Sequence, residues 1–148
     1  MKILIINGPN LNLLKSRIKK HYGSYTLDEI FSMLQKRFKS VEFKMVQSNS
    51  ENEFINYIHG AEHNGFLGIL INPGAFSHTS VAIRDALEIC ALPKIEVHLS
   101  NIQSRDNFRK VSLTASICDG YISGFKSLSY IAGAFTLINL IEEKESHK

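Results

Sequence analysis

The sequence predicts an α/β fold built around a parallel β-sheet, and two observations lead to this class. Short apolar runs rich in β-branched residues recur along the chain, as expected of strands that are buried on both faces. Helical patterns lie between most of these runs. Strands that alternate with helices form parallel sheets with right-handed crossovers, so each run is assigned to a strand of one sheet.

The first strand is expected at 3–6 and is followed by the turn Asn7-Gly8-Pro9-Asn10. This turn has one glycine, whereas a dinucleotide-binding loop needs three. The polar stretch 15–25 is long for a connection between a strand and a helix, which is typical of a lid or a binding loop. A helix is expected to start at Thr26, because Glu29 stands where it completes a capping box.

The second strand is expected at 41–46, where apolar and charged residues alternate as on the edge of a sheet. Ser50 and Glu53 predict a capping box for the next helix. The third strand is expected at 66–71 and runs into Asn-Pro-Gly, which forces a turn. The cap of the helix that follows is expected to be Ser77, Thr79 or Ser80.

The fourth strand is expected at 95–99, then a polar stretch at 100–110 with one short helical turn, then a fifth strand at 118–122. A last helix is expected at 128–141, and residues 142–148 are expected to fray. Its core contacts are expected to be Ile131, Phe135, Ile138 and Ile141. Five such units predict a flavodoxin-like three-layer sandwich, in which a five-stranded parallel sheet has the order 2-1-3-4-5.

The composition of the 148 residues is that of one globular domain, expected to span 1–148. Hydrophobic residues make up 44% and charged residues 21%, and the net charge of +3 is too mild to indicate nucleic-acid binding. Cys90 and Cys118 lie in apolar patterns without zinc-ligand spacing, so we expect buried thiols in a reducing compartment. The sequence has neither a signal-peptide pattern nor an apolar stretch of membrane-spanning length, which predicts a cytoplasmic protein.

The predicted strand order brings polar residues together at the carboxyl ends of strands one, three and four, where open α/β sheets bind ligands. These residues are Asn10, Asn72 with His78, and Glu96 with His98. Glu96 and His98 are two apart on a strand, so they point to the same face. A carboxylate that binds one ring nitrogen fixes the imidazole tautomer and makes it a proton donor or acceptor. From spacing alone, catalysis and a structural buried pair remain open, and a metal site lacks an evident third ligand.

The predicted lid adds Arg17 and Tyr22. A protonated tyrosine is a poor base, but a neighbouring guanidinium favours the phenolate. An Arg–Tyr pair on a mobile loop would deliver a base to a substrate and exclude water on closing. From spacing alone, a solvated basic loop with a packed tyrosine is the favoured interpretation.

Several segments together carry a more specific signal than any one of them. They are INGPNLNLL at 6–14, Arg17 with Tyr22-Gly23, QSN at 47–49, NPGAFSHTS at 72–80, IEVHLSN at 95–101, and Arg105 with Phe108-Arg109. In order and in spacing, these segments resemble the type II 3-dehydroquinate dehydratases over nearly the whole chain. The resemblance implies the reversible loss of water from 3-dehydroquinate to give 3-dehydroshikimate, without a metal or an organic cofactor.

The resemblance also implies roles for five residues in catalysis. Tyr22 is expected to be the base that removes a proton from the carbon next to the ketone, and Arg17 to keep it ionised. Asn10 is expected to stabilise the enolate oxygen through a water. His98, oriented by Glu96, is expected to protonate the leaving hydroxyl.

Six further residues are implied in substrate binding. Asn72, His78 and Arg109 would hold substrate hydroxyls, and Leu99 and Ser100 would hold the carboxylate. The family implies a homododecamer of four trimers, in which Asp85 reaches the site of a neighbouring subunit. An anionic substrate also suits a mildly basic protein.

The chain departs from the family pattern in its lid, where Lys15 replaces a glycine and Lys19 replaces a proline. These changes remove a flexible point and a rigid one, so altered lid behaviour is expected. Lys126 stands where glycine is common, which bears on packing or assembly. Two alternatives stay open: a catalytically impaired homologue, and a non-enzymatic flavodoxin-like binding module.

Overall fold

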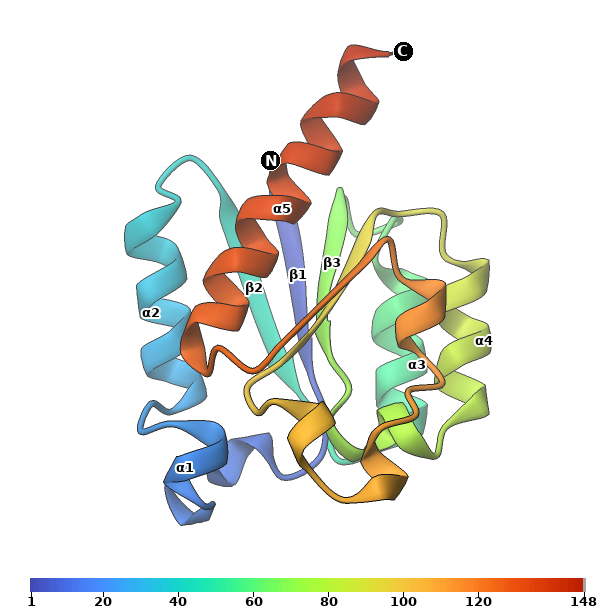
Figure 1. Ribbon diagram of the computed structural model, residues 1–148. Coiled ribbons are helices and arrows are strands. Elements are labelled where there is room, and N and C mark those ends of the chain that lie inside the picture. Colours follow the sequence, from blue (N-terminus) through green and yellow to red (C-terminus); the bar gives the residue numbers. More distant parts are fainter. Residues whose placement is uncertain (148) are drawn as a thin grey trace.

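A computed structural model describes residues 1–147 and confirms the predicted sheet. Five parallel strands are hydrogen-bonded in the order β2-β1-β3-β4-β5 (Figure 1). The strands are β1 (Lys2–Asn7), β2 (Glu42–Gln47), β3 (Gly68–Asn72), β4 (Lys94–His98) and β5 (Gly120–Ser123). Strand β2 lies at an edge, as its alternating pattern predicts, whereas β3 and β4 are buried along their whole length.

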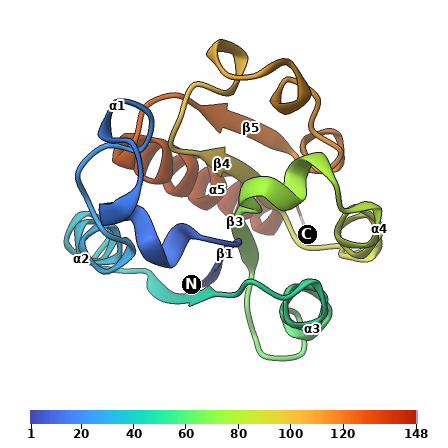
Figure 2. The ribbon, with the colours of Figure 1, turned by 90° about the horizontal axis from the view of Figure 1, so that it is seen from below.

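Helices cover both faces of this sheet and complete the three layers. Seen along the strands in Figure 2, α2 (Leu27–Arg37) and α5 (Ser127–Ser146) lie on one side. Helices α3 (Glu51–Gly60) and α4 (Val81–Ile89) lie on the other side. Among residues 1–147, no helix is both long and apolar enough to cross a membrane.

Alternation along the strands divides the core between the two faces. Ile5 belongs to a buried cluster with Leu34 of α2, whereas its neighbour Ile6 belongs to the opposite cluster with Phe54 of α3 and Ile83 of α4. All five side chains are fully buried, and each contributes about 1.5–3 kcal/mol through that burial. A two-sided core of this kind requires the near-continuous apolar runs seen in the sequence.

One of the two predicted capping boxes forms in full. Thr26 accepts from the backbone N–H of Glu29, and the Glu29 carboxylate accepts from the backbone N–H of Thr26 at 2.7 Å. The second forms only in half, because Ser50 accepts from the Glu53 N–H while the Glu53 carboxylate accepts from the Ser48 hydroxyl. The predicted start of α3 is therefore correct, but Glu53 ties it to the end of β2.

Short helical turns replace the loops expected at the carboxyl ends of the strands. The predicted lid contains a 3-10 helix (Leu11–Ser16) and α1 (Lys19–Tyr22). A 3-10 helix (Gly74–His78) precedes α4, which is capped by Ser80. Two 3-10 turns follow β4, where one was expected, and a third precedes β5.

Helix α5 differs most from the prediction. It continues to Ser146, so the expected fraying from 142 is wrong for the described residues, and Lys148 lies outside them. Phe135, expected in the core, is 61% exposed, whereas Tyr130 is fully buried. Cys118 precedes β5 and does not lie within a strand. Both cysteines are partly buried free thiols.

Candidate active site

A cavity of about 30 Å³ lies at the carboxyl edge of the sheet, beyond the ends of β3 and β4. Its walls include eight residues singled out in the sequence, namely Arg17, Tyr22, Asn72, His78, His98, Leu99, Ser100 and Arg109. In Figure 2 the lid around α1 and the loop after β4 come together over this edge. The volume accommodates one or two waters, so a larger ligand enters only when the lid or this loop moves.

Tyr22 carries the most concentrated positive environment in the cavity. Its side chain is 9% exposed, and its hydroxyl accepts hydrogen bonds from Arg17 and, at 2.8 Å, from Arg105. The Arg17 guanidinium also lies 3.9 Å from the centroid of the Tyr22 ring. Two cationic donors on one phenol oxygen stabilise negative charge there.

The charge on Arg17 reflects opposing influences. Burial lowers the pKa of Arg17, the Tyr22 side chain raises it, and the positive charges of Arg105 and Arg109 lower it further. An arginine remains protonated despite such a shift. Arg17, Arg105 and Arg109 all line the cavity, and this cluster favours an anionic ligand.

Glu96 and His98 form a buried pair on β4. The Glu96 Oε1 to His98 Nε2 distance is 2.6 Å, and the two residues are 0% and 4% exposed. Glu96 also accepts from the hydroxyls of Ser112, at 3.2 Å, and Thr114, at 2.6 Å. Three side chains therefore meet the hydrogen-bonding needs of the buried Glu96 carboxyl group. Of Glu96 and His98, only His98 lines the cavity, and Glu96 lies behind it.

Asn72 ends β3 and is held from behind by α5. Its Nδ2 donates to the hydroxyl of Tyr130 at 2.8 Å, and that hydroxyl donates to Asn7 Oδ1 at 2.5 Å. Its Oδ1 accepts from the backbone N–H of Gly74 at 3.2 Å. One amide hydrogen of Asn72 is left for a ligand in the cavity.

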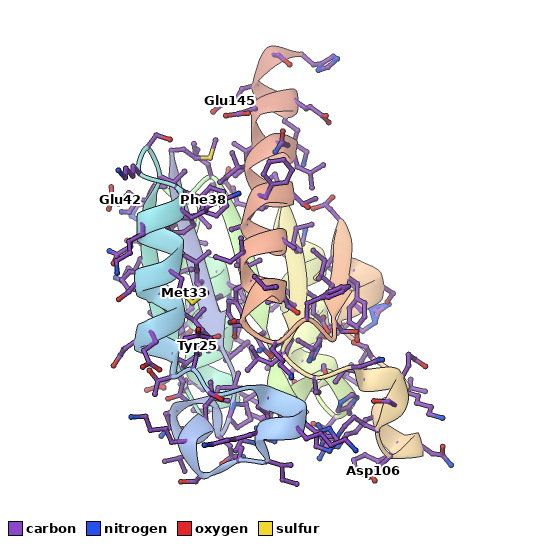
Figure 3. The ribbon with its side chains drawn as sticks, turned by 60° about the vertical axis from the view of Figure 1, so that its left-hand side comes forward. Tyr25, Met33, Phe38, Glu42, Asp106 and Glu145 are labelled. Carbon is purple, nitrogen blue, oxygen red and sulfur yellow. The ribbon has the colours of Figure 1, made fainter. Side chains whose placement is uncertain are left out.

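His78 and Arg109 also line the cavity. His78 Nδ1 donates to the Val111 carbonyl at 2.8 Å, which leaves Nε2 to a ligand. Burial lowers the pKa of His78, and the Val111 carbonyl opposes that effect, so the ring is neutral at pH 7 and Nε2 accepts. Arg109 Nε lies 3.4 Å from Asp106, which Figure 3 places at the same end of the molecule as the lid.

Three of the sequence-predicted residues lie outside the cavity wall, namely Glu96, which lies behind His98, and Asn10 and Asp85. Asn10 is exposed, has a left-handed backbone (φ 66°) and donates its N–H to Asn49 Oδ1 at 3.1 Å. Asp85 is exposed on α4. Their roles remain predictions.

Arg105 is the one charged wall residue that received no role from the sequence. Arg105, whose Nη1 contacts both Tyr22 and Ser100, stood in the quoted motif and could have been found there. No sequence pattern indicated that the Ser112 and Thr114 hydroxyls bind Glu96, because these residues lie 16 and 18 positions further along the chain.

Fold and site together define a class: a flavodoxin-like α/β protein whose cavity brings together a tyrosine held by two arginines, a carboxylate–histidine pair and a cluster of three arginines. The family model described as "Dehydroquinase class II" matches residues 1–138. The chain belongs to the class II dehydroquinase family.

Individual relatives support this membership. A 3-dehydroquinate dehydratase from Thermotoga neapolitana is 50% identical over 88% of this chain and 90% of its own length. One from Helicobacter pylori is 45% identical over 99% of this chain and 90% of its own. A type II dehydroquinase structure from Butyrivibrio crossotus superposes with a TM-score of 0.89 at 45% identity, covering 93% of this chain and 97% of that one. These findings do not favour the alternative of a non-enzymatic binding module.

Proposed function

We propose that the chain, acting as a single catalytic domain over 1–148, dehydrates 3-dehydroquinate reversibly to 3-dehydroshikimate and water. The observation that carries the proposal is the placement of Tyr22, under two guanidinium groups, in the same cavity as the Glu96–His98 pair. An elimination needs a base for one proton and an acid for the leaving oxygen, and these residues supply both. No step requires a metal or an organic cofactor.

The first step is removal of a proton from the carbon next to the ketone. The Tyr22 phenolate takes this proton, and the electrons of the C–H bond pass into an enolate. Arg17 and Arg105 stabilise the phenolate before the transfer, through hydrogen bonds to its oxygen. The enolate oxygen requires a donor where its charge develops, and we assign this to Asn10 acting through a water.

The second step is loss of the hydroxyl. His98 donates a proton to the leaving oxygen, the C–O bond breaks, and the enolate collapses to the conjugated enone with release of water. Glu96 holds the ring through Nε2 and stabilises the imidazolium, so the other ring nitrogen faces the substrate. Tyr22 has gained one proton and His98 has lost one, and exchange with solvent restores both.

Binding is assigned to groups around the two reacting centres. Asn72 and His78 present one amide donor and one imidazole acceptor, which suit substrate hydroxyls. Arg109 adds a cationic donor for a hydroxyl. The backbone of Leu99 and Ser100 and the Ser100 hydroxyl are assigned to the carboxylate, and Arg105 at 3.2 Å from that hydroxyl adds positive charge.

We further propose that the active form is a cytoplasmic homododecamer of four trimers, in which Asp85 reaches a neighbouring site. The exposed position of Asp85 on α4, away from its own cavity, supports a role in another subunit.

The reaction is tested by the absorbance of the enone product after 3-dehydroquinate is added to the wild type and to Tyr22→Phe. We expect turnover by the wild type and a loss of about 10²–10⁴-fold in kcat for the variant, because the base is missing. Calorimetric titration measures binding of substrate to both. A wild type that binds without turnover would be the impaired homologue, and one that does neither would contradict the proposal.

A further inference from the structure

Lys126 adopts a backbone conformation that is normally reserved for glycine. Its φ of 53° and ψ of −133° lie in a region that an L-residue with a Cβ enters only under strain. In residues 1–147 the only other non-glycine with positive φ is Asn10, whose left-handed turn is common for asparagine. The strain at Lys126 therefore calls for a compensating role of its side chain.

The main chain of Lys126 joins the catalytic strand to the last helix. Its N–H donates to the Leu99 carbonyl at 2.8 Å, directly after His98, and its carbonyl accepts from the Ser129 N–H at 3.0 Å in the first turn of α5. The residue is thus fixed at both ends, and its Cβ direction is set by β4 and α5.

The side chain of Lys126 reaches the turn that carries Tyr22. A methyl group placed on Gly23 would lie 3.3, 3.6 and 3.5 Å from Cβ, Cγ and Cδ of Lys126. The aliphatic stem therefore runs along Gly23, which ends α1 and donates its N–H to the Lys19 carbonyl at 2.8 Å. Gly23 has a φ of 80°, so the absence of a Cβ serves both its conformation and this close approach.

We propose that Lys126 is a positioning residue for Tyr22. The aliphatic stem of Lys126 supports the closed lid against the strand that carries His98. The inference rests on the proposed function and concerns how its two proton-transfer groups are held together. The Leu99 carbonyl, next to His98 in the chain, holds the backbone of Lys126, and the Lys126 stem lies over Gly23, next to Tyr22 in the chain. Lys126 touches no reacting atom, and its ammonium takes no part in these contacts.

Three substitutions in the full chain separate the stem from the charge and from the strain. Lys126→Met keeps the stem and removes the charge, Lys126→Ala removes the stem and keeps a Cβ, and Lys126→Gly removes both the stem and the strain. We expect Lys126→Met to retain wild-type kcat, and Lys126→Ala and Lys126→Gly to lose about tenfold or more, because misplacing a catalytic group by about 1 Å can cost about 10²-fold. Of the three variants, only Lys126→Gly is expected to raise the thermal unfolding midpoint, because it removes the backbone strain. A raised midpoint would rule out misfolding as the cause of its lower kcat.

A second readout does not depend on turnover. Lys19 and Lys20 are exposed trypsin sites in the lid, and cleavage there, identified by fragment mass, reports how often the lid opens. We expect faster lid cleavage in Lys126→Ala and Lys126→Gly than in the wild type and Lys126→Met. Equal kcat and equal lid cleavage in all four proteins would overturn the proposal. A loss of kcat in Lys126→Met as large as that in Lys126→Ala would also overturn it. If the wild type lacks the dehydratase activity, the proposed function fails, while the cleavage rates still decide whether Lys126 supports the lid.

Discussion

At the scale of single residues, the site depends on how a buried carboxylate is compensated. Glu96 is fully buried, and three side chains donate to it. The spacing of Glu96 and His98 on one strand could be predicted from alternation alone. The hydroxyls of Ser112 and Thr114 could not, because they reach Glu96 only through the course of the chain between β4 and β5.

Removing one of these hydroxyls tests their importance. In Thr114→Val the shape of the side chain is kept, but Glu96 Oε2 loses the donor that lies at 2.6 Å. We expect the free energy of unfolding to fall by about 1–3 kcal/mol. If the activation free energy of the reaction rises by about 1.4 kcal/mol as a result, kcat falls about tenfold. Urea denaturation and product absorbance measure the two effects.

Thr114→Ser is the matched control, because it keeps the hydroxyl and loses a methyl group. We expect kcat in Thr114→Ser to stay close to that of the wild type, and well above that of Thr114→Val. Wild-type kcat in Thr114→Val would mean that Thr114 does not assist the Glu96–His98 pair.

At the scale of elements, amphipathic helices were predictable and apolar ones were less so. Helix α2 has a complete N-terminal capping box and an amphipathic apolar stripe, and its start matches the prediction. Helix α5 carries apolar residues on most sides, so its pattern did not reveal that Phe135 faces outward and Tyr130 inward. The four-residue α1 is too short for any periodic signal. It starts at Lys19, a first-turn position where a proline also fits, so the replacement leaves the helical turn intact.

The inward phenol of α5 supports the floor of the cavity. In Tyr130→Phe, Asn7 Oδ1 and Asn72 Nδ2 both lose their contact with the phenol oxygen in a fully buried location. We expect the free energy of unfolding to drop by about 1–3 kcal/mol, as is usual for unsatisfied buried groups. We also expect a several-fold rise in KM, because Asn72 lines the cavity and is no longer fixed.

Denaturation and steady-state kinetics check both effects, and Tyr57→Phe makes the same chemical change on a partly exposed side chain of α3. That control is expected to stay within about 0.5 kcal/mol of the wild type. An unchanged KM in Tyr130→Phe, together with lower stability, would limit Tyr130 to a structural role.

At the scale of the whole molecule, alternation of strands and helices was enough to predict the strand order and the edge at which the site lies. It could not predict that the lid and the loop after β4 come so close that the cavity between them has a volume of only about 30 Å³. This closure depends on side-chain contacts such as that of Arg105 with Tyr22. The protomer also leaves large apolar side chains exposed on α5 and in the turn between β5 and α5. Phe125 is 65%, Leu128 59% and Phe135 61% exposed, which supports further burial in an assembly.

The assembly proposal predicts a mass twelve times that of the protomer in sedimentation experiments. It also predicts that Asp85→Ala lowers kcat/KM without changing that mass, because Asp85 is exposed on α4 and would act on a neighbour's substrate. A mixed assembly gives the sharper test. When Tyr22→Phe and Asp85→Ala subunits are produced together, some sites combine an intact Tyr22 with an Asp85 from the adjacent subunit. Activity above the sum of the two separate variants is then expected. If the mixture only matches that sum, or if Asp85→Ala behaves like the wild type, Asp85 does not complete a neighbouring site.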